Sequence, residues 1–170
     1  MNLFLTGYRA TGKTSVARYI AEQLDMPWFD SDRLIEQAAE MSIADVFTLE
    51  SEEGFRDRET AVIRQLAAGE NQIVSLGGGA IVRSENRKLL EGRGRVVWLQ
   101  ASADKIYERL TQDPQTDCQR PDLTAQGGLD EIRLLLELRQ PLYESVADFY
   151  VNTDDLSPQQ VADRIIQRMG

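Results

Sequence analysis

Short apolar runs alternate with longer segments of helical periodicity along this chain. Five of the runs predict strands, at residues 3–5, 27–29, 73–76, 96–99 and 149–151. No Gly/Ser linker, internal repeat or low-complexity tract interrupts the alternation. Strands separated by helices are typical of a parallel sheet that is covered by helices on both faces. The pattern therefore predicts one α/β domain around a five-stranded parallel sheet.

Two segments do not fit this simple alternation. Residues 32–68 are too many for one helix, and residues 113–128 are polar and rich in turn formers. Long connections in a compact domain are often functional, so we expect a substrate cover and a lid. The last helix has a clear start, with Ser157 as N-cap, Pro158 at the first helical position and Gln160 placed for a capping box.

Composition narrows the chemistry that this domain can perform. The 170 residues include no histidine and one cysteine, Cys118, which excludes histidine bases, cysteine-cluster metal sites and an internal disulfide. Catalysis must rely on carboxylates, Lys, Arg and a hydrated metal ion. The formal net charge of −9 argues against nucleic-acid or anionic-membrane partners, because such partners attract basic surfaces. No apolar run reaches the ~18 residues of a membrane span, and a phosphate-loop motif stands where a signal peptide would be cleaved, so we expect a soluble cytoplasmic protein.

That motif is the most specific feature of the chain and follows the first predicted strand. It matches G-x-x-x-x-G-K-[ST], in which backbone N–H groups and a helix N-terminus bind a di- or triphosphate. Lys13 would neutralise the β- and γ-phosphates, and the Thr14 hydroxyl would coordinate Mg²⁺. The alternative is a glycine turn before an ordinary helix. We expect the nucleotide to contact Gly7, Tyr8, Arg9, Ala10, Thr11, Gly12, Lys13, Thr14 and Ser15.

Two carboxylates, Asp30 and Asp32, follow the second predicted strand, at the edge where open α/β sheets bind ligands. In extended backbone, residues two apart point the same way, so one would face the water shell of a metal and the other a substrate hydroxyl. The alternative is that Ser31 or Asp32 only caps the next helix. Because Ser75 stands near the place of the Asp of a standard Walker B strand, Asp30 is the expected indirect metal partner.

Two further motifs allow a functional and a purely structural interpretation. Arg56 and Glu59 share a helical face, so Arg56 would bind a substrate carboxylate while Glu59 holds its guanidinium. The alternative is a solvated lattice of helical ion pairs that includes Glu52. Three consecutive glycines at 77–79 are entropically unfavourable unless the backbone approaches something closely, such as a ligand. Here the alternative is a tight turn.

Three arginines occupy positions where positive charge would be useful. Arg120, in the lid candidate, would stabilise a transferring phosphoryl group. Arg139 would clamp a carboxylate, and it precedes Pro141, which must kink or end the long helix that begins near residue 129. Arg109, on the helix after the fourth strand, would stack on a base. Each of them could instead be an ordinary surface arginine.

Taken in order, these motifs closely resemble those of shikimate kinase over nearly the whole chain. They are the phosphate loop, Phe-Asp-Ser-Asp, Gly-Phe-Arg-x-Arg-Glu, the triple glycine, Arg-Pro and Arg-x-Pro-Leu-Tyr. The resemblance implies a three-layer P-loop fold of the nucleoside-monophosphate-kinase type, with sheet order 2-3-1-4-5. It also implies ATP-dependent phosphorylation of the shikimate 3-hydroxyl, in aromatic amino-acid biosynthesis. A single domain would span residues 1–170, with an acceptor-binding region near 31–62 and a lid near 112–126.

The resemblance also implies a role for each motif residue. The catalytic residues would be Lys13, Asp32 and Arg120, and nucleotide contacts beyond the loop would come from Arg109 and Arg120. Magnesium would be held directly by Thr14 and through water by Asp30. Shikimate would contact Asp32, Arg56, Gly77, Gly78, Gly79 and Arg139, with Glu59 behind Arg56. The partners would be ATP, Mg²⁺ and shikimate, and the enzyme a monomer without nucleic-acid or membrane partners.

Two departures and two alternatives qualify this picture. Ala10 replaces a glycine that many members have in the loop, so its backbone must avoid a strictly glycine-only conformation. Residues 154–156 replace an arginine that some relatives place against adenine.

A gluconate or nucleotide kinase would share the loop but lack the set of Asp32, Arg56 and Arg139. A GTP-binding switch would need D-x-x-G, which is missing here, and residues 152–155 only loosely imitate N-K-x-D.

Overall fold

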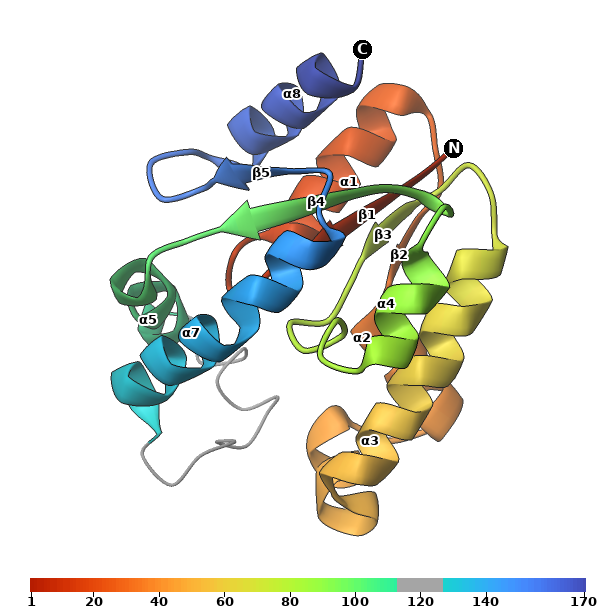
Figure 1. Cartoon of the computed structure of the whole chain (residues 1–170), viewed down its shortest axis with the longest axis vertical. Coiled ribbons are helices and arrows are strands. Elements are labelled where there is room, and N and C mark those ends of the chain that lie inside the picture. The colour runs from red at the N-terminus through yellow and green to blue at the C-terminus, as the bar shows by residue number, and fades with distance from the viewer. Residues whose placement is uncertain (113–126) are drawn as a thin grey trace.

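Strands and helices alternate along the chain in the order that the apolar pattern predicts. The computed structural model describes residues 1–112 and 127–170. Its five strands form one parallel sheet in the order β2-β3-β1-β4-β5, as expected (Figure 1). The elements are β1 (Asn2–Thr6), α1 (Lys13–Leu24), β2 (Trp28–Asp30), α2 (Ser31–Ala39), α3 (Ile43–Ala68), β3 (Ile73–Ser75), α4 (Ser84–Leu90), β4 (Gly94–Gln100), α5 (Ala103–Gln112), α7 (Gly128–Val146), β5 (Phe149–Asn152) and α8 (Pro158–Met169).

The central strand β1 is buried along its whole length, which explains why its sequence is apolar rather than alternating. Leu3 and Leu5 point to the core layer under α1 and α8, whereas Phe4 points to the layer under α2, α3, α4 and α7. In Figure 1, α1 and α8 lie above the sheet, and α3, α4 and α7 lie below it. The domain thus has three layers, and the loop after β1 leaves from the middle of the sheet.

The long segment expected to exceed one helix is indeed divided. Helix α2 ends at Ala39, and α3 contains a break at Ser51, whose φ of 66° and ψ of 178° are not helical. Arg58 donates hydrogen bonds of 2.7 Å to both carboxylate oxygens of Glu50 across this break. Glu50 and Arg58 therefore fix the angle between the two parts of α3.

Pro141 does not end α7, which continues to Val146. A proline inside a helix removes one backbone hydrogen bond, so other contacts must retain the last turn. Tyr143 supplies them: it is fully buried, and its ring stacks on Trp98 with centroids 5.4 Å apart. The predicted capping box of α8 is confirmed, with Ser157 and Gln160 hydrogen-bonded in both directions. Among the described helices, none is long and apolar enough to cross a membrane.

Candidate active site

A cavity of about 510 Å³ lies where the phosphate-loop motif, the end of β2 and the glycine segment after β3 meet. Motifs that are far apart in the sequence therefore converge on one space. The lining residues are Arg9, Ala10, Gly12, Lys13, Thr14, Ser15, Asp30, Asp32, Arg33, Glu36, Ser75, Leu76, Gly77, Gly78 and Arg109. Gly7, Tyr8, Thr11, Arg56, Gly79 and Arg139 are absent from this lining.

The loop between β1 and α1 has the geometry of a phosphate-binding loop. Gly7 has a φ of 144°, and a Cβ at this position would lie 2.4 Å from the carbonyl oxygen of Leu99. The Lys13 ammonium donates to the carbonyls of Gly7 and Tyr8 at 2.7 and 2.8 Å. Thr11 donates to the same Tyr8 carbonyl at 2.8 Å. The loop is therefore closed around the lysine charge at the positive end of α1.

Ala10 adopts a φ of 62°, in the left-handed region that favours glycine. A residue with a Cβ enters this region at a cost of roughly 1 to 2 kcal/mol. The Cβ of Ala10 therefore strains the loop. The Arg109 guanidinium holds the segment from outside by donating to the Ala10 carbonyl at 3.1 Å and to the Thr153 carbonyl at 3.0 Å.

Asp30 has two roles, which divide between its two oxygens. Oδ1 accepts from the backbone N–H groups of Asp32 and Arg33 at 3.0 and 3.2 Å, so Asp30 is the N-cap of α2. Oδ2 accepts from the Thr14 hydroxyl at 2.7 Å, with the Ser75 hydroxyl 3.3 Å from Thr14. Because the Thr14 proton points to Asp30, a lone pair of its oxygen remains for a cation. These oxygen ligands suit Mg²⁺, which takes few protein ligands beside phosphates.

The helix begins at Ser31, which corrects two expectations about this segment. The cap is Asp30 rather than Ser31 or Asp32. Asp30 and Asp32 also do not share a face of extended backbone, because Asp32 lies in the first turn of α2. Both carboxylates nevertheless line the cavity. The Ser31 hydroxyl instead accepts a hydrogen bond of 2.8 Å from the Gly77 N–H and thereby ties α2 to the glycine segment.

Close approach explains two of the three consecutive glycines, and none of the three has a positive φ. A Cβ on Gly78 would lie 3.0 Å from the backbone nitrogen of Arg9, and a Cβ on Gly79 would lie 2.6 Å from the Arg56 guanidinium. The Tyr143 hydroxyl donates to the Gly78 carbonyl at 2.6 Å. The expected close approach is confirmed, and the neighbours are the phosphate loop and Arg56.

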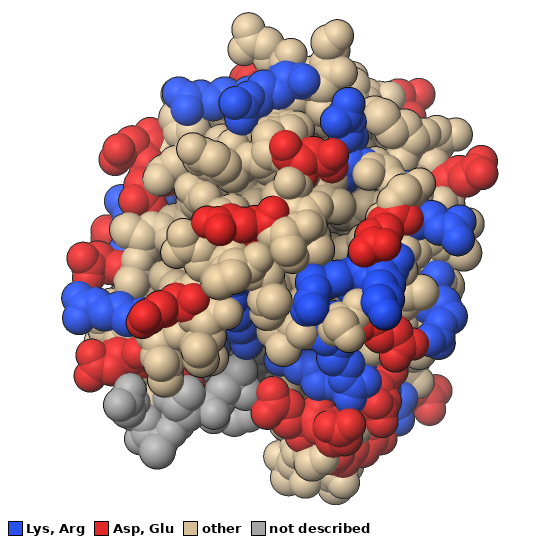
Figure 2. Space-filling view, in the orientation of Figure 1, with Lys and Arg blue, Asp and Glu red and all other residues tan. Residues whose placement is uncertain are grey.

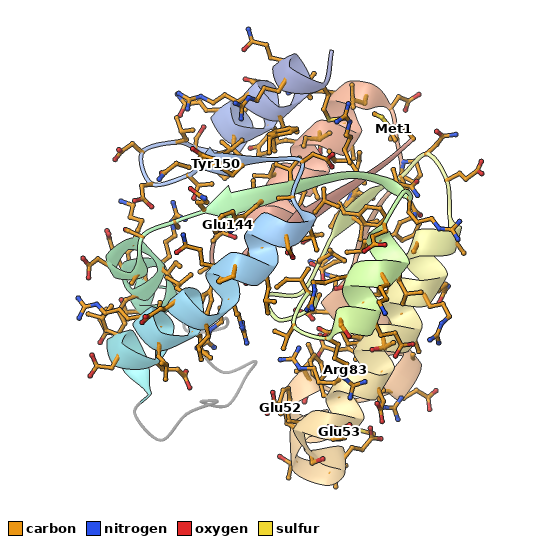
Figure 3. The ribbon with its side chains drawn as sticks, in the orientation of Figure 1. Met1, Glu52, Glu53, Arg83, Glu144 and Tyr150 are labelled. Carbon is orange, nitrogen blue, oxygen red and sulfur yellow. The ribbon has the colours of Figure 1, made fainter. Side chains whose placement is uncertain are left out.

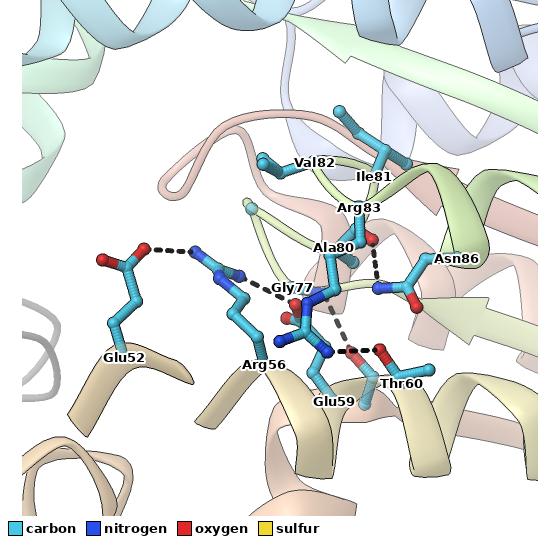
Figure 4. Close-up of polar contacts among 12 residues, drawn as sticks. Glu52, Arg56, Glu59, Thr60, Gly77, Ala80, Ile81, Val82, Arg83 and Asn86 are labelled. Atoms are coloured by element: carbon cyan, nitrogen blue, oxygen red, sulfur yellow. Dashed lines mark hydrogen bonds and ion pairs between the residues drawn. The ribbon is translucent and has the colours of Figure 1, made fainter. Parts of the chain in front are cut away.

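Arg56 is 6% exposed and is held between two carboxylates (Figure 4). Its Nη1 lies 2.7 Å from Oε1 of Glu59, which is fully buried, and its Nη2 lies 3.7 Å from Oε1 of Glu52. The predicted contact with Glu59 is therefore confirmed. Of the two carboxylates, only Glu52 fits the alternative of a solvated ion-pair lattice, because its side chain is 58% exposed.

Arg139 is equally buried, at 7% exposure, but its surroundings differ. Its guanidinium carbon lies 5.6 Å from the centroid of the Tyr8 ring. Within the described part of the chain, no carboxylate forms an ion pair with it. Arg139 is thus not an ordinary surface arginine.

Some contributing residues carry no clear signal in the sequence. Glu36 lines the cavity, and its position four residues after Asp32 on one helix could have indicated this. Ser75 and Tyr143 lie inside recognised motifs, but their partners are set by tertiary structure. Arg120, Cys118 and the lid candidate at 113–126 lie outside the described residues.

A phosphate loop at the end of the central strand of this sheet, with carboxylates in the same cavity lining, places the chain among the P-loop kinases of small molecules. A family model described as shikimate kinase matches residues 9–170. A shikimate kinase of Symbiobacterium thermophilum is 41% identical over 169 residues, which cover 99% of this chain and 96% of the relative. One of Alteromonas mediterranea is 42% identical, with the same coverage. A solved shikimate kinase of Acinetobacter baumannii, in complex with shikimate, is 35% identical with a TM-score of 0.92, covering 99% of this chain and 92% of that one. The chain therefore belongs to the shikimate kinase family of ATP-dependent kinases.

Proposed function

We propose that this chain transfers the γ-phosphoryl group of ATP to the 3-hydroxyl of shikimate, giving shikimate 3-phosphate and ADP. Membership of the family supports the kinase activity, and the buried arginines support the acceptor. Arg56 and Arg139 are 6% and 7% exposed, and burial of a charged group is unfavourable unless an anion pairs with it. Glu59 already pairs with Arg56, whereas no carboxylate among the described residues forms an ion pair with Arg139. A carboxylate matches the planar fork of a guanidinium. The observation that supports this proposal most is that Arg139 is buried and has no carboxylate partner among the described residues.

On the donor side, the phosphates of ATP lie against the loop and the positive end of α1. Lys13, and Arg120 by family resemblance, stabilise charge on the phosphate oxygens, and Arg109 lies on the side of the base. Thr14 would hold Mg²⁺ directly, and Asp30 would hold it through water. The metal would neutralise charge on the β- and γ-phosphates.

On the acceptor side, Arg56 and Arg139 bind the carboxylate of shikimate, and residues 77–79 let the backbone approach the ring. Asp32 accepts a hydrogen bond from the attacking hydroxyl and takes its proton late in the transfer. Phosphoryl transfer depends mainly on positioning and charge stabilisation, so no histidine is needed. Residues 31–62 form the acceptor-binding region and residues 112–126 the lid, which limits hydrolysis of ATP by water.

The enzyme is proposed to act as a cytoplasmic monomer without nucleic-acid or membrane partners. The formal net charge of −9 supports the absence of nucleic-acid and anionic-membrane partners. On the face in Figure 2, acidic and basic side chains are interspersed rather than separated into regions of one sign. Light scattering should give the mass of one chain, with and without ATP and shikimate.

The decisive experiment measures ADP release with ATP and Mg²⁺ across a panel of acceptors: shikimate, quinate, gluconate and nucleoside monophosphates. Assays without acceptor give the ATPase background. Of these acceptors, only shikimate should give turnover well above this background. The product should have the mass of shikimate plus one phosphoryl group. Turnover with gluconate or a nucleotide and none with shikimate would replace this proposal with one of the alternative kinases.

A further inference from the structure

Tyr8 belongs to the phosphate loop, yet its side chain leaves the nucleotide side of the site. It is 2% exposed and packs with Ile106 and Leu110 of α5 and with Ile132 of α7. It is absent from the cavity lining, whereas Arg9 and Ala10, which follow it, line the cavity. Its backbone carbonyl serves the loop by accepting from Lys13 and Thr11. The ring can therefore contact residues outside the cavity.

The ring of Tyr8 faces Arg139. The guanidinium carbon of Arg139 lies 5.6 Å from the ring centroid, which is within the range of a cation–π contact. Burial raises the pKa of the Tyr8 hydroxyl, although Arg9 and Arg139 oppose the shift, so the side chain stays neutral at physiological pH. In the described residues, this ring is the contact that stabilises the charge of Arg139.

A second contact ties the same part of the loop to the helix of Arg139. Arg9 lies 3.7 Å from Glu131, which is 1% exposed and stands on α7. The guanidinium of Arg9 is also 6.0 Å from the Tyr8 ring. Two consecutive loop residues thus contact α7, so the phosphate loop and the helix that carries Arg139 form one packed unit.

We propose that Tyr8 is a positioning residue for recognition of the acceptor carboxylate, because its ring orients and stabilises the Arg139 guanidinium. A residue of the donor loop would thereby set the affinity for the acceptor. The inference rests on the proposed function, in which Arg139 binds the carboxylate of shikimate. An aliphatic side chain at position 8 would fill part of the volume but would provide no electron-rich face for the guanidinium.

The test compares Tyr8→Leu with Tyr8→Phe, which keeps the ring. Tyr8→Leu should raise the KM for shikimate by roughly five- to thirtyfold, the effect of losing one buried cation–π contact, and should change kcat and the KM for ATP by clearly less. Tyr8→Phe should restore the KM for shikimate. Tyr19→Leu is the matched control, because Arg18 lies 5.8 Å from the Tyr19 ring on α1, away from the acceptor side. It should leave all three parameters unchanged.

Because Tyr8 is part of a core cluster, Tyr8→Leu could fail to fold, and a second series guards against this. Phenylalanines with increasing fluorination at position 8 keep the ring shape but weaken its negative face. The KM for shikimate should rise along the series, whereas the KM for its uncharged carboxamide should not. A flat series, or an equal rise for ATP, overturns the role of Tyr8. If Arg139→Met also leaves the KM for shikimate unchanged, the proposed function of Arg139 fails as well.

Discussion

Arg56 and Arg139 are buried to the same extent, but the protein prepares the two charges differently. Arg56 contacts the fully buried carboxylate of Glu59 at 2.7 Å. Arg139 contacts the ring of Tyr8, and in the described residues it has no carboxylate partner. One guanidinium is therefore neutralised and fixed before the substrate binds, whereas the other keeps its charge for the ligand. The comparison suggests that Arg56 contributes mainly geometry and Arg139 mainly electrostatic attraction.

The surroundings of Arg56 strengthen this contrast. Arg83, just before α4, donates to Asp57 at 2.8 Å and lies 3.0 Å from Glu53, both on α3. Figure 3 shows Arg83 and Glu53 close to each other beside α3. The hydrogen bond with Asp57 is the main cause that raises the pKa of the Arg83 guanidinium. These contacts hold the part of α3 that carries Arg56 against the segment that ends at Arg83, after the three glycines.

The largest effect is expected for Arg56→Met, because it leaves the Glu59 carboxylate buried without its arginine. Breaking one partner of a buried ion pair costs about 3 to 5 kcal/mol, so the free energy of unfolding should fall by that order. The KM for shikimate should rise far more than that for ATP. Chemical denaturation and steady-state kinetics measure the two effects.

The double variant Arg56→Met/Glu59→Gln is the control for this interpretation. Without the buried charge on Glu59, it should recover much of the lost stability but none of the affinity for shikimate. Equal instability of the single and double variants would mean that packing, and not the ion pair, explains the loss.

Arg139→Met should behave in the opposite way. It removes a buried charge without leaving a carboxylate unpaired among the described residues, so unfolding stability should stay at or above that of the wild type. The KM for shikimate should nevertheless rise roughly 10- to 100-fold, as expected for loss of a charge-assisted hydrogen bond of ~1.5 to 3 kcal/mol. A loss of stability as large as that of Arg56→Met would remove the distinction between the two arginines.

A smaller effect is expected for Arg83→Gln, which removes the contacts of Arg83 with Asp57 and Glu53 on α3. Surface ion pairs contribute about 0.2 to 1 kcal/mol each, so stability should fall by about 1 kcal/mol or less. The KM for shikimate should rise a few-fold because Arg56 becomes less fixed. Arg64→Gln is a matched control, because Arg64 pairs with Glu85 of α4 from the exposed side of α3. An equal change in KM for both variants would contradict a specific role of Arg83.

The smallest effect is expected for Glu52→Gln, which makes the surroundings of Arg56 more like those of Arg139. Glu52 lies 3.7 Å from Arg56, but its side chain is 58% exposed. Stability should therefore change by less than about 0.5 kcal/mol. The KM for shikimate should fall slightly, because a competing carboxylate is removed. A clear rise in KM would instead assign Glu52 to the support of Arg56.

Local patterns predicted the parts of this molecule that local chemistry determines. The order of strands and helices, the capping box at Ser157 and the contact of Arg56 with Glu59 follow from spacing along the chain. The resemblance to a family supplied the sheet order. The role of Asp30 as cap was missed, because either Ser31 or Asp32 is an equally good cap until the first helical residue is known.

Tertiary contacts could not be predicted from spacing. The Tyr143 hydroxyl bonds to Gly78, and the Tyr8 ring contacts Arg139, across a large sequence separation. The continuation of α7 past Pro141 depends on packing of Tyr143 against Trp98, which outweighs the local preference of proline. The difference between Arg56 and Arg139 likewise comes from neighbours that lie far apart in the sequence.

The most direct test of the central claim compares shikimate with its uncharged carboxamide in the wild type and in Arg139→Met. If Arg139 recognises the carboxylate, the wild type should prefer shikimate in kcat/KM by roughly 10- to 100-fold, which corresponds to ~1.5 to 3 kcal/mol. In Arg139→Met, this preference should largely disappear, because the remaining arginine, Arg56, already pairs with Glu59. An undiminished preference in the variant would contradict the account and show that the carboxylate is recognised elsewhere.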